Sequence, residues 1–90
     1  MSATLIVRHT VSDYAAWKVV YDEVGALRTS HGCTAEQVLR VPGDPNDVAA
    51  THEFPTVEQA QQFAEDPALK EAMGRGGVTS APRIEIFENA

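Results

Sequence analysis

LRVPGDPNDVAATHEF, residues 39–54, sets a dense turn signal between two runs of strand-forming residues. The turn signal is PGDPND at 42–47, where Pro and Gly set unusual φ values and Asp and Asn hydrogen-bond their own backbone. The flanking runs, 35–41 and 48–54, predict two strands, and Pro55 helps to end the second because it lacks a backbone donor. The stretch therefore predicts a β-hairpin.

A strand and a helix precede this hairpin. Residues 3–11, ATLIVRHTV, are rich in β-branched side chains and predict a strand whose first half is apolar on both faces. Ser12 is the expected N-cap of a helix over 13–30, and the helix dipole favours Asp13 in its first turn. The apolar stripe of this helix recurs at steps of three and four residues and consists of Trp17, Val20, Tyr21, Val24 and Leu27.

A second helical region and a further strand follow the hairpin. A capping-box spacing that starts at Thr56 opens a helix over 57–66. Asp66 and Pro67 then restart the helix as cap and first residue, and glycines end it. Residues 83–88, RIEIFE, alternate as a fourth strand.

The order strand–helix–strand–strand–helix–strand predicts an α+β protein with the ferredoxin-like fold, βαββαβ. Its usual product is a four-stranded antiparallel sheet with both helices on one face. We expect residues 1–90 to form this single domain. A chain of this length buries only roughly 60–65% of its extended-chain surface, so its core is marginal and oligomerisation is favoured.

Charge and composition exclude several kinds of partner. The net charge is −6, from 13 acidic and 7 basic residues without a basic run, so nucleic acid and anionic membranes are poor partners. No apolar stretch reaches the ~18 residues that a membrane span needs. The first residues lack a basic and long apolar leader, and the single Cys33 cannot form an intrachain disulfide. We expect a cytoplasmic protein.

Strand parity separates two faces of the predicted sheet. The more apolar set, expected to meet the helices, is Leu5, Val7, His9, Val11, Val48, Ala50, His52, Phe54, Ile84 and Ile86. The other set is mixed and consists of Ile6, Arg8, Val38, Thr51, Glu53, Glu85 and Phe87. We expect a second copy of the chain to cover this mixed face, since burial of its apolar area supplies roughly 25 cal/mol per Å². Its arginines, Arg8 and Arg40, would then pair with Glu53 or Glu85 across the sheet or the interface.

These features resemble the dimeric α+β barrel superfamily over nearly the whole chain. The resemblance is carried by the helix YAAWKVVYDE (14–23), the hairpin at 39–54 and the segment TVEQAQQFAEDPALKEAM (56–73). That superfamily includes antibiotic biosynthesis monooxygenases, small aromatic-polyketide cyclases and uncharacterised proteins. The resemblance implies a homodimer with two sheets face to face, and a small-molecule pocket between the sheet and helices of each subunit.

The histidines argue against a metal or haem cofactor. Some members of the superfamily degrade haem that is bound by a histidine on the second helix, but His9, His31 and His52 all lie elsewhere. His9 and His52 are expected several residues apart along their strands, and no His-x-His or Cys-x-x-Cys spacing occurs. We expect no metal and no cofactor.

His52 is the candidate catalytic residue, because it is a titratable side chain on the helix-facing side of a strand. The side chains expected to wall a cavity for a small apolar or aromatic ligand are Trp17, Tyr21, Phe63, Met73 and His9. The alternative is that these residues form only the core, with His52 hydrogen-bonded to a carbonyl group.

Two further motifs have weaker chemical meaning. His31 and Cys33 flank Gly32 and suggest a base and a nucleophile, but side chains two residues apart seldom face each other and no orienting acid is evident nearby. GRGG at 74–77 lacks the strand-then-helix context of a phosphate loop, so it is expected to be a connection.

Three functions are compatible with these features. The first is a cofactor-free monooxygenase for aromatic or polyketide-like substrates, in which the substrate carbanion activates oxygen and His52 acts as base. The second is a cyclase or isomerase that uses a pocket histidine with a pKa near 6.5 as its acid–base group. The third is a pocket that binds without turnover, or a dimer whose role is interaction only.

Overall fold

The computed structural model describes residues 2–90 and contains four strands and four helices. In chain order the elements are β1 (Ala3–Thr10), α1 (Tyr14–Glu23), α2 (Gly25–Ser30), β2 (Ala35–Val41), β3 (Asp44–Phe54), α3 (Val57–Glu65), α4 (Pro67–Arg75) and β4 (Arg83–Glu88). The strands form one antiparallel sheet in the order β2-β3-β1-β4. The expected ferredoxin-like α+β fold is therefore confirmed.

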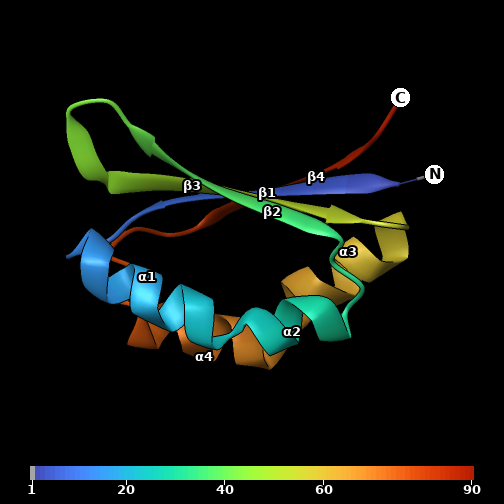
Figure 1. Ribbon diagram of the computed structural model, residues 1–90, viewed down its shortest axis with the longest axis horizontal. Coiled ribbons are helices and arrows are strands. Elements are labelled where there is room, and N and C mark those ends of the chain that lie inside the picture. Colours follow the sequence, from blue (N-terminus) through green and yellow to red (C-terminus); the bar gives the residue numbers. More distant parts are fainter. Residues whose placement is uncertain (1) are drawn as a thin grey trace.

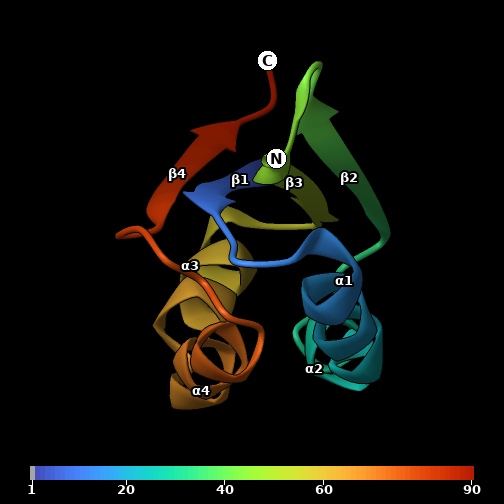
Figure 2. The ribbon, with the colours of Figure 1, turned by 90° about the vertical axis from the view of Figure 1, so that its left-hand side faces the viewer.

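The helices all lie on one face of the sheet, as Figures 1 and 2 show. In Figure 2, α1 and α2 lie below β2, and α3 and α4 lie below β4. Among the residues that the structure describes, the opposite face of the sheet has no helix over it. Within residues 2–90, none of the helices has both the length and the apolar character needed to cross a bilayer.

The first predicted helix differs from expectation at its start and in its middle. Its N-cap is Asp13 rather than Ser12, because the Asp13 carboxylate accepts from the Ala15 N–H while the Ser12 N–H donates to the Gly77 carbonyl. The expected single helix over 13–30 is two, α1 and α2, since Val24 leaves the helical conformation at φ −93° and ψ 19°. The caps at Thr56 and Asp66 are confirmed.

The hairpin turn is shorter than the sequence predicts. Val41 pairs with Asp44, so the turn is Pro42 and Gly43 rather than 42–47, and Gly43 takes the positive φ (+83°) that such a tight loop requires. The additional strand residues pair with the end of β1, where Thr10 lies opposite Asp47. The register with β2 shifts between Arg40 and Val41, and the Asp44 carboxylate accepts from the Asn46 N–H as a local turn does. Pairing with β1 thus extends β3 through this segment while that local turn is kept.

The face predicted to meet the helices does form the core. Burial alternates along β1 and β3, and Leu5, His52 and Phe54 are at most 2% exposed. Ala60 and Phe63 of α3 pack on this face from below. The alternation confirms the assignment of His52 to the helix side and of Glu53 to the opposite side.

The open face carries a different set of β2 residues than expected. Val38 lies opposite Ala50 and packs against the cluster around Trp17, so it faces the helices, and Leu39 faces outward at 44% exposed. Arg40 is also on the helix side, with its guanidinium 4.3 Å from the Tyr14 ring centroid. The prediction that Val38 and Arg40 face away from the helices was wrong. The pairing of the edge strand β2 with β3 decides which of its side chains face the helices.

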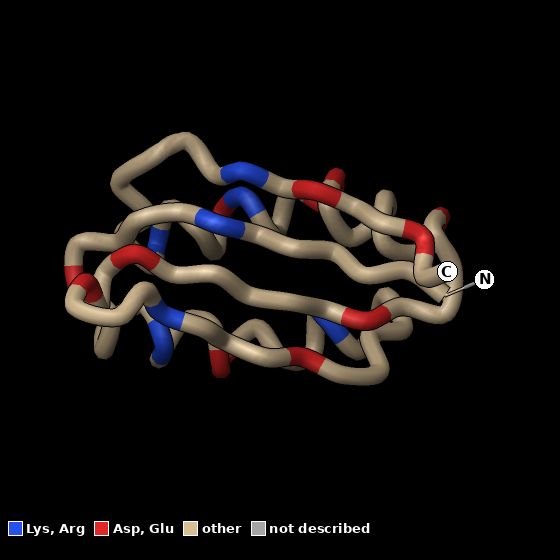
Figure 3. Tube along the Cα trace, turned by 90° about the horizontal axis from the view of Figure 1, so that it is seen from above, with Lys and Arg blue, Asp and Glu red and all other residues tan. Residues whose placement is uncertain are grey.

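Ion pairs on the open face join other partners than expected within the chain. Arg8 pairs with Asp47 at 3.1 Å, and the Glu53 carboxylate accepts from the Thr4 hydroxyl at 2.7 Å. Arg83 pairs with Glu85 at 3.1 Å. Figure 3, viewed from above the sheet, shows charged residues of both signs scattered over it rather than gathered in one patch.

A pair of identical substitutions tests where the core lies. Val48 is 1% exposed and Val19 is 57% exposed. We expect Val48→Ala to lower the free energy of unfolding by about 2 kcal/mol, because it removes two buried methyl groups and leaves a cavity. Val19→Ala should change it by less than about 0.5 kcal/mol. Urea unfolding measures both, and equal effects would contradict the placement of the core.

Candidate functional site

A cavity lies between the helix-facing side of the sheet and the helices. Its wall contains all six residues singled out from the sequence, which are His9, Trp17, Tyr21, His52, Phe63 and Met73. The free volume between these side chains is about 40 Å³. Since a buried water needs roughly 10–15 Å³ of such space, the cavity has room for a few waters but not for an aromatic ring.

An aromatic row forms one side of the cavity. Trp17 and Tyr21, one turn apart on α1, have ring centroids 4.9 Å apart. The His52 ring follows at 6.0 Å from Tyr21, and Phe63 at 5.6 Å from His52. These spacings are typical of packed aromatic pairs. The strand register and the helix repeat therefore bring residues from α1, β3 and α3 into one continuous wall.

The two cavity histidines lie apart. His9 is opposite Val48 and His52 is opposite Leu5, an offset of four residues along β1, or about 13 Å. His9 instead packs edge-on against Trp17, with centroids 5.6 Å apart. In the part of the chain that the structure describes, no cluster of three or more His, Cys, Asp or Glu side chains is placed to hold a metal ion.

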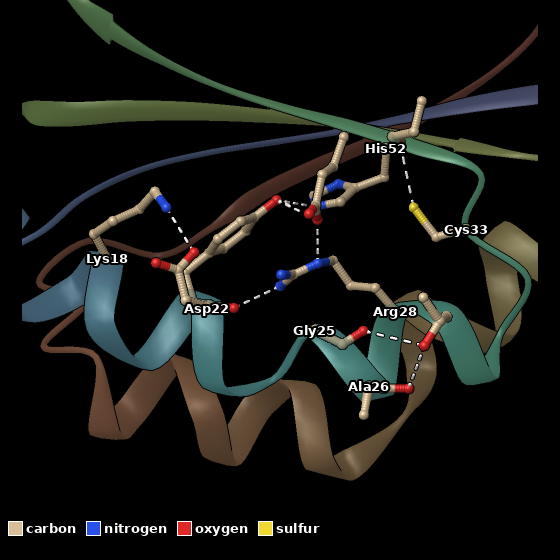
Figure 4. Close-up of polar contacts among 11 residues, drawn as sticks. Lys18, Asp22, Gly25, Ala26, Arg28, Cys33 and His52 are labelled. Atoms are coloured by element: carbon tan, nitrogen blue, oxygen red, sulfur yellow. Dashed lines mark hydrogen bonds and ion pairs between the residues drawn. The ribbon is translucent and has the colours of Figure 1, made fainter.

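A polar network joins the cavity to the protein surface. The Tyr21 hydroxyl lies 3.0 Å from His52 Nε2 and 3.3 Å from Glu36 Oε2. Because this hydroxyl carries one hydrogen and Glu36 is half-exposed, the three groups form a path for a proton from the buried ring to solvent. Figure 4 shows His52 reaching down from the sheet toward this network.

Arg28 is the part of the site that the sequence analysis missed. It lines the cavity from α2, is only 4% exposed and forms an ion pair through Nε with Glu36. Its Nη1 donates to the Tyr21 carbonyl at 2.8 Å, and its guanidinium carbon lies 3.9 Å from the Tyr21 ring centroid. The available signal was the spacing of the helix stripe, since Arg28 follows Val24 by four residues.

Burial favours the neutral forms of His52, His9 and Tyr21. Desolvation, together with the nearby Arg28 charge, lowers the pKa of His52 to about 4. Desolvation also lowers the pKa of His9 and raises that of the Tyr21 hydroxyl. A cyclase that needs a histidine with a pKa near 6.5 is therefore not matched by His52, because the site is too dry and too close to a cation.

Three buried nitrogens of the cavity wall lack a hydrogen bond in good geometry among the described residues, one on each of His9, His52 and Arg28, of which the Arg28 nitrogen contacts Glu36 as an ion pair. His52 Nδ1 and His9 Nδ1 have no partner in hydrogen-bond geometry among residues 2–90. The expected alternative is a core histidine bonded to a carbonyl group. Burial lowers the pKa of His52, whereas the backbone of Leu5, which does lie by it, acts to raise that pKa, and in addition Nε2 contacts the Tyr21 hydroxyl. Unsatisfied buried polar atoms are uncommon in folded proteins and mark places where a ligand or water fits.

The remaining sequence motifs are structural. His31 Nε2 lies 2.8 Å from the Asp66 carboxylate, so an acid does lie beside it, contrary to expectation. The reason is that the end of α2 lies next to the start of α4. Cys33 donates its thiol hydrogen to the Ala35 carbonyl, and burial raises the pKa of that thiol, which is the opposite of activation. Gly76 allows close packing against Trp17, where a Cβ would lie 3.0 Å from the indole.

Comparison with solved structures places this fold among known proteins. SnoaB, a cofactor-independent oxygenase from Streptomyces nogalater, is 15% identical over 99% of this chain and 93% of its own, with a TM-score of 0.80. A proposed antibiotic biosynthesis monooxygenase from Bordetella bronchiseptica is 14% identical over 99% and 97%, with a TM-score of 0.82. A protein of unknown function from Nitrosomonas europaea is 22% identical over 98% and 88%, with a TM-score of 0.76.

These likenesses show a shared fold. No protein-family model matches the chain, and no curated protein matches it. The resemblance to antibiotic biosynthesis monooxygenase-like proteins that the sequence suggested is therefore confirmed for the architecture, over nearly the full length of both chains.

The low pKa of His52 predicts a pH dependence of stability. His52 in the unfolded chain binds a proton below about pH 6.5, whereas in the folded protein it does so only below about pH 4. The unfolded state therefore binds more protons between these values, and stability is full above pH 6.5 and falls as the pH is lowered. We expect this group to contribute a loss of about 3 kcal/mol by pH 4.

Urea unfolding of the wild type and His52→Gln between pH 4 and 8 measures this contribution. The variant should lose less stability on acidification than the wild type, since groups common to both proteins, such as Asp66, cancel in the difference. Parallel pH profiles would show that His52 is not buried in the neutral form.

Proposed function

We propose that the protein binds a small aromatic molecule in the cavity beneath its sheet and oxidises it with molecular oxygen, without a cofactor. The observation that carries this proposal is the aromatic wall that contains the Tyr21–His52 pair, inside a mostly apolar cavity that Arg28 also lines. The fold agrees with it, because SnoaB is described as a cofactor-independent oxygenase and shares the architecture.

The reaction needs only an electron-rich substrate and oxygen. A phenolic ring loses its hydroxyl proton, and the resulting anion has carbanion character at the ring carbon opposite the oxygen. One electron passes to O₂, and the two radicals combine into a carbon–peroxide bond. After the peroxide takes up a proton, loss of water leaves a quinone, so that one phenol and one O₂ give one quinone and one water.

The protein supplies positioning and a route for protons. The Tyr21 hydroxyl and His52 Nε2 form the polar end of the cavity, and Glu36 connects them to solvent. His52 has a pKa of about 4 and is therefore a weak base at neutral pH. It shares a hydrogen bond with the Tyr21 hydroxyl and passes a proton along rather than storing it, which suits a substrate that is itself acidic.

The second candidate is a pocket that binds without turnover, or a dimer whose role is interaction only, and the free volume of about 40 Å³ favours the interaction role. A ring can enter only if side chains of the wall move apart. A cavity that stays filled by its own side chains would leave the protein with an interaction role. The cyclase or isomerase has less support, because the His52 pKa lies far from neutrality.

The working protein is proposed to be a homodimer, formed through the open sheet face. Phe87 on β4 and Leu39 on β2 are 51% and 44% exposed at the two edges of this face, and Ile6 lies between them on the central strand β1. Exposed apolar residues on a sheet face without helices are typical of a surface that a partner covers. The single free cysteine agrees with a cytoplasmic location.

Oxygen uptake with a panel of phenols and hydroxylated polycyclic aromatics tests the oxygenase proposal. We expect turnover by the wild type, and a fall in kcat/KM of about 100-fold in His52→Gln, the scale of a lost proton-transfer group. His31→Gln is the matched control, because His31 lies outside the cavity wall and should keep full activity. Tight binding of these compounds without oxygen uptake would instead establish the binding protein.

Sedimentation at micromolar concentration tests the dimer. The wild type should sediment at close to twice the 9.7 kDa mass of the chain. Ile6→Asp should dissociate it, because the substitution buries an unpaired charge in the interface. Val19→Asp places the same charge on the outer side of α1, where the side chain is 57% exposed, and should remain dimeric. A monomeric wild type, or dissociation by Val19→Asp alone, would contradict this interface.

A further inference from the structure

Arg28 stands between the inner cavity and a second hollow that opens beside α2. This outer hollow lies between α2 and the start of β2, has a free volume of about 210 Å³, and is lined by Gly25, Thr29, Cys33, Thr34, Ala35 and Glu36 together with Arg28. Arg28 is shared by the linings of both spaces, whereas Tyr21 and His52 line only the inner one. A ligand that enters from the outer hollow therefore meets the guanidinium before it meets the aromatic wall.

The hydrogen-bond capacity of Arg28 is only partly used. Its Nε pairs with Glu36, and its Nη1 donates to the Tyr21 carbonyl. Nη2 lies on the Gly25 side, and a Cβ at Gly25 would be 3.5 Å from it. Within residues 2–90 this nitrogen has no side-chain or carbonyl partner. A guanidinium that is 4% exposed thus keeps donors available toward the outer hollow.

Glu36 is an exchangeable counterion. A buried cation requires an anion beside it, and Glu36 fills that place in the empty protein. The Glu36 side chain is 45% exposed, however, so it can turn into solvent when another anion takes its place at the buried guanidinium. The structure therefore holds an internal carboxylate where an external oxyanion can bind to the guanidinium, through one oxygen for a phenolate or through two for a carboxylate.

Other charged and titratable groups around Arg28 do not compete for this role. Tyr21 from α1, His52 from β3 and Cys33 from the loop before β2 are all held neutral by burial, which shifts each pKa toward the uncharged form. The chain as a whole carries a net charge of −6, which repels anions. Any affinity for an anion at this place must therefore come from Arg28 itself.

We propose that Arg28 is the specificity-determining residue of the site, and that the protein takes its aromatic ligand as an oxyanion, a phenolate or an aryl carboxylate. The ligand oxygen replaces Glu36 at the guanidinium, and the ring extends from the outer hollow toward the inner cavity, which admits it when the side chains of its wall move apart. For a phenol, the hydroxyl proton passes to the released Glu36 carboxylate and on to solvent. This inference rests on the proposed ligand cavity and adds the class of compound that the cavity selects.

The proposal has a direct spectroscopic test, because 4-nitrophenol changes colour on ionisation. We expect the wild type to lower the apparent pKa of bound 4-nitrophenol by about one unit or more, which corresponds to at least about tenfold tighter binding of the phenolate than of the phenol. Arg28→Met should abolish that shift. Lys70→Met removes one positive charge from the exposed side of α4 and should leave the shift unchanged.

Glu36→Gln provides an independent variant at a half-exposed position, where a folded product is expected. Removal of the internal carboxylate leaves Arg28 without its counterion, so the phenolate should bind more tightly than to the wild type, by about tenfold. Weaker or unchanged phenolate binding in Glu36→Gln would overturn the proposal, whatever the fate of Arg28→Met.

Two further probes separate the possible failures. 4-Nitroanisole has the same ring without an acidic proton, and 4-nitrobenzoate carries a carboxylate. Equal binding of nitroanisole and nitrophenol without a pKa shift would overturn the role of Arg28 and leave the ligand cavity standing. Binding of none of the three would overturn both proposals. A preference for nitrobenzoate over nitrophenol would support Arg28 and assign the ligand to the aryl carboxylates.

Discussion

The pairing of β1 with both β3 and β4 is the constraint on which the rest of the structure depends. Leu5 lies opposite His52 on one side and opposite Ile86 on the other, and its side chain is fully buried. A shift of one residue in this register would turn the whole apolar set of β1 toward the open face. The same register carries His9 and His52 to opposite ends of the cavity, so the fold and the site have one origin.

The cavity combines an apolar wall with a small number of polar groups that burial holds neutral. Desolvation shifts the pKa values of His52 and Tyr21 away from their charged forms, and the Arg28 cation acts on His52 in the same direction. The one full charge at the edge of the cavity is compensated by a half-exposed glutamate. Such an arrangement stabilises an anion on a ligand more readily than a protonated histidine, and this electrostatic preference unites the proposed oxidation with the selection of oxyanions.

The candidate site could be predicted in part, for a clear physical reason. Trp17 and Tyr21 lie on a helix repeat, and His52 lies on a strand alternation, so simple periodicity aims all three at the same interior. Arg28 was not predicted as a site residue, because a charged residue in an apolar stripe is ordinarily solvated. Its burial depends on the turn at Val24 that separates α1 from α2. Glu36 was not predicted either, because only the register of β2 places it beside that arginine.

By itself the sequence determined the order of elements, the antiparallel sheet, the core face and the caps at Thr56 and Asp66, because these follow from local periodicity and from side chains that bond their own backbone. Tertiary structure alone decided the length of the hairpin, the outward face of β2 and the break at Val24. In the first two of these places pairing with a neighbouring strand decides the outcome: β1 extends β3 through Asp47, and β3 sets the parity of Val38 and Leu39. The tertiary structure also decided the size of the cavity, since free volume is what remains after the side chains from the sheet and the helices have packed together.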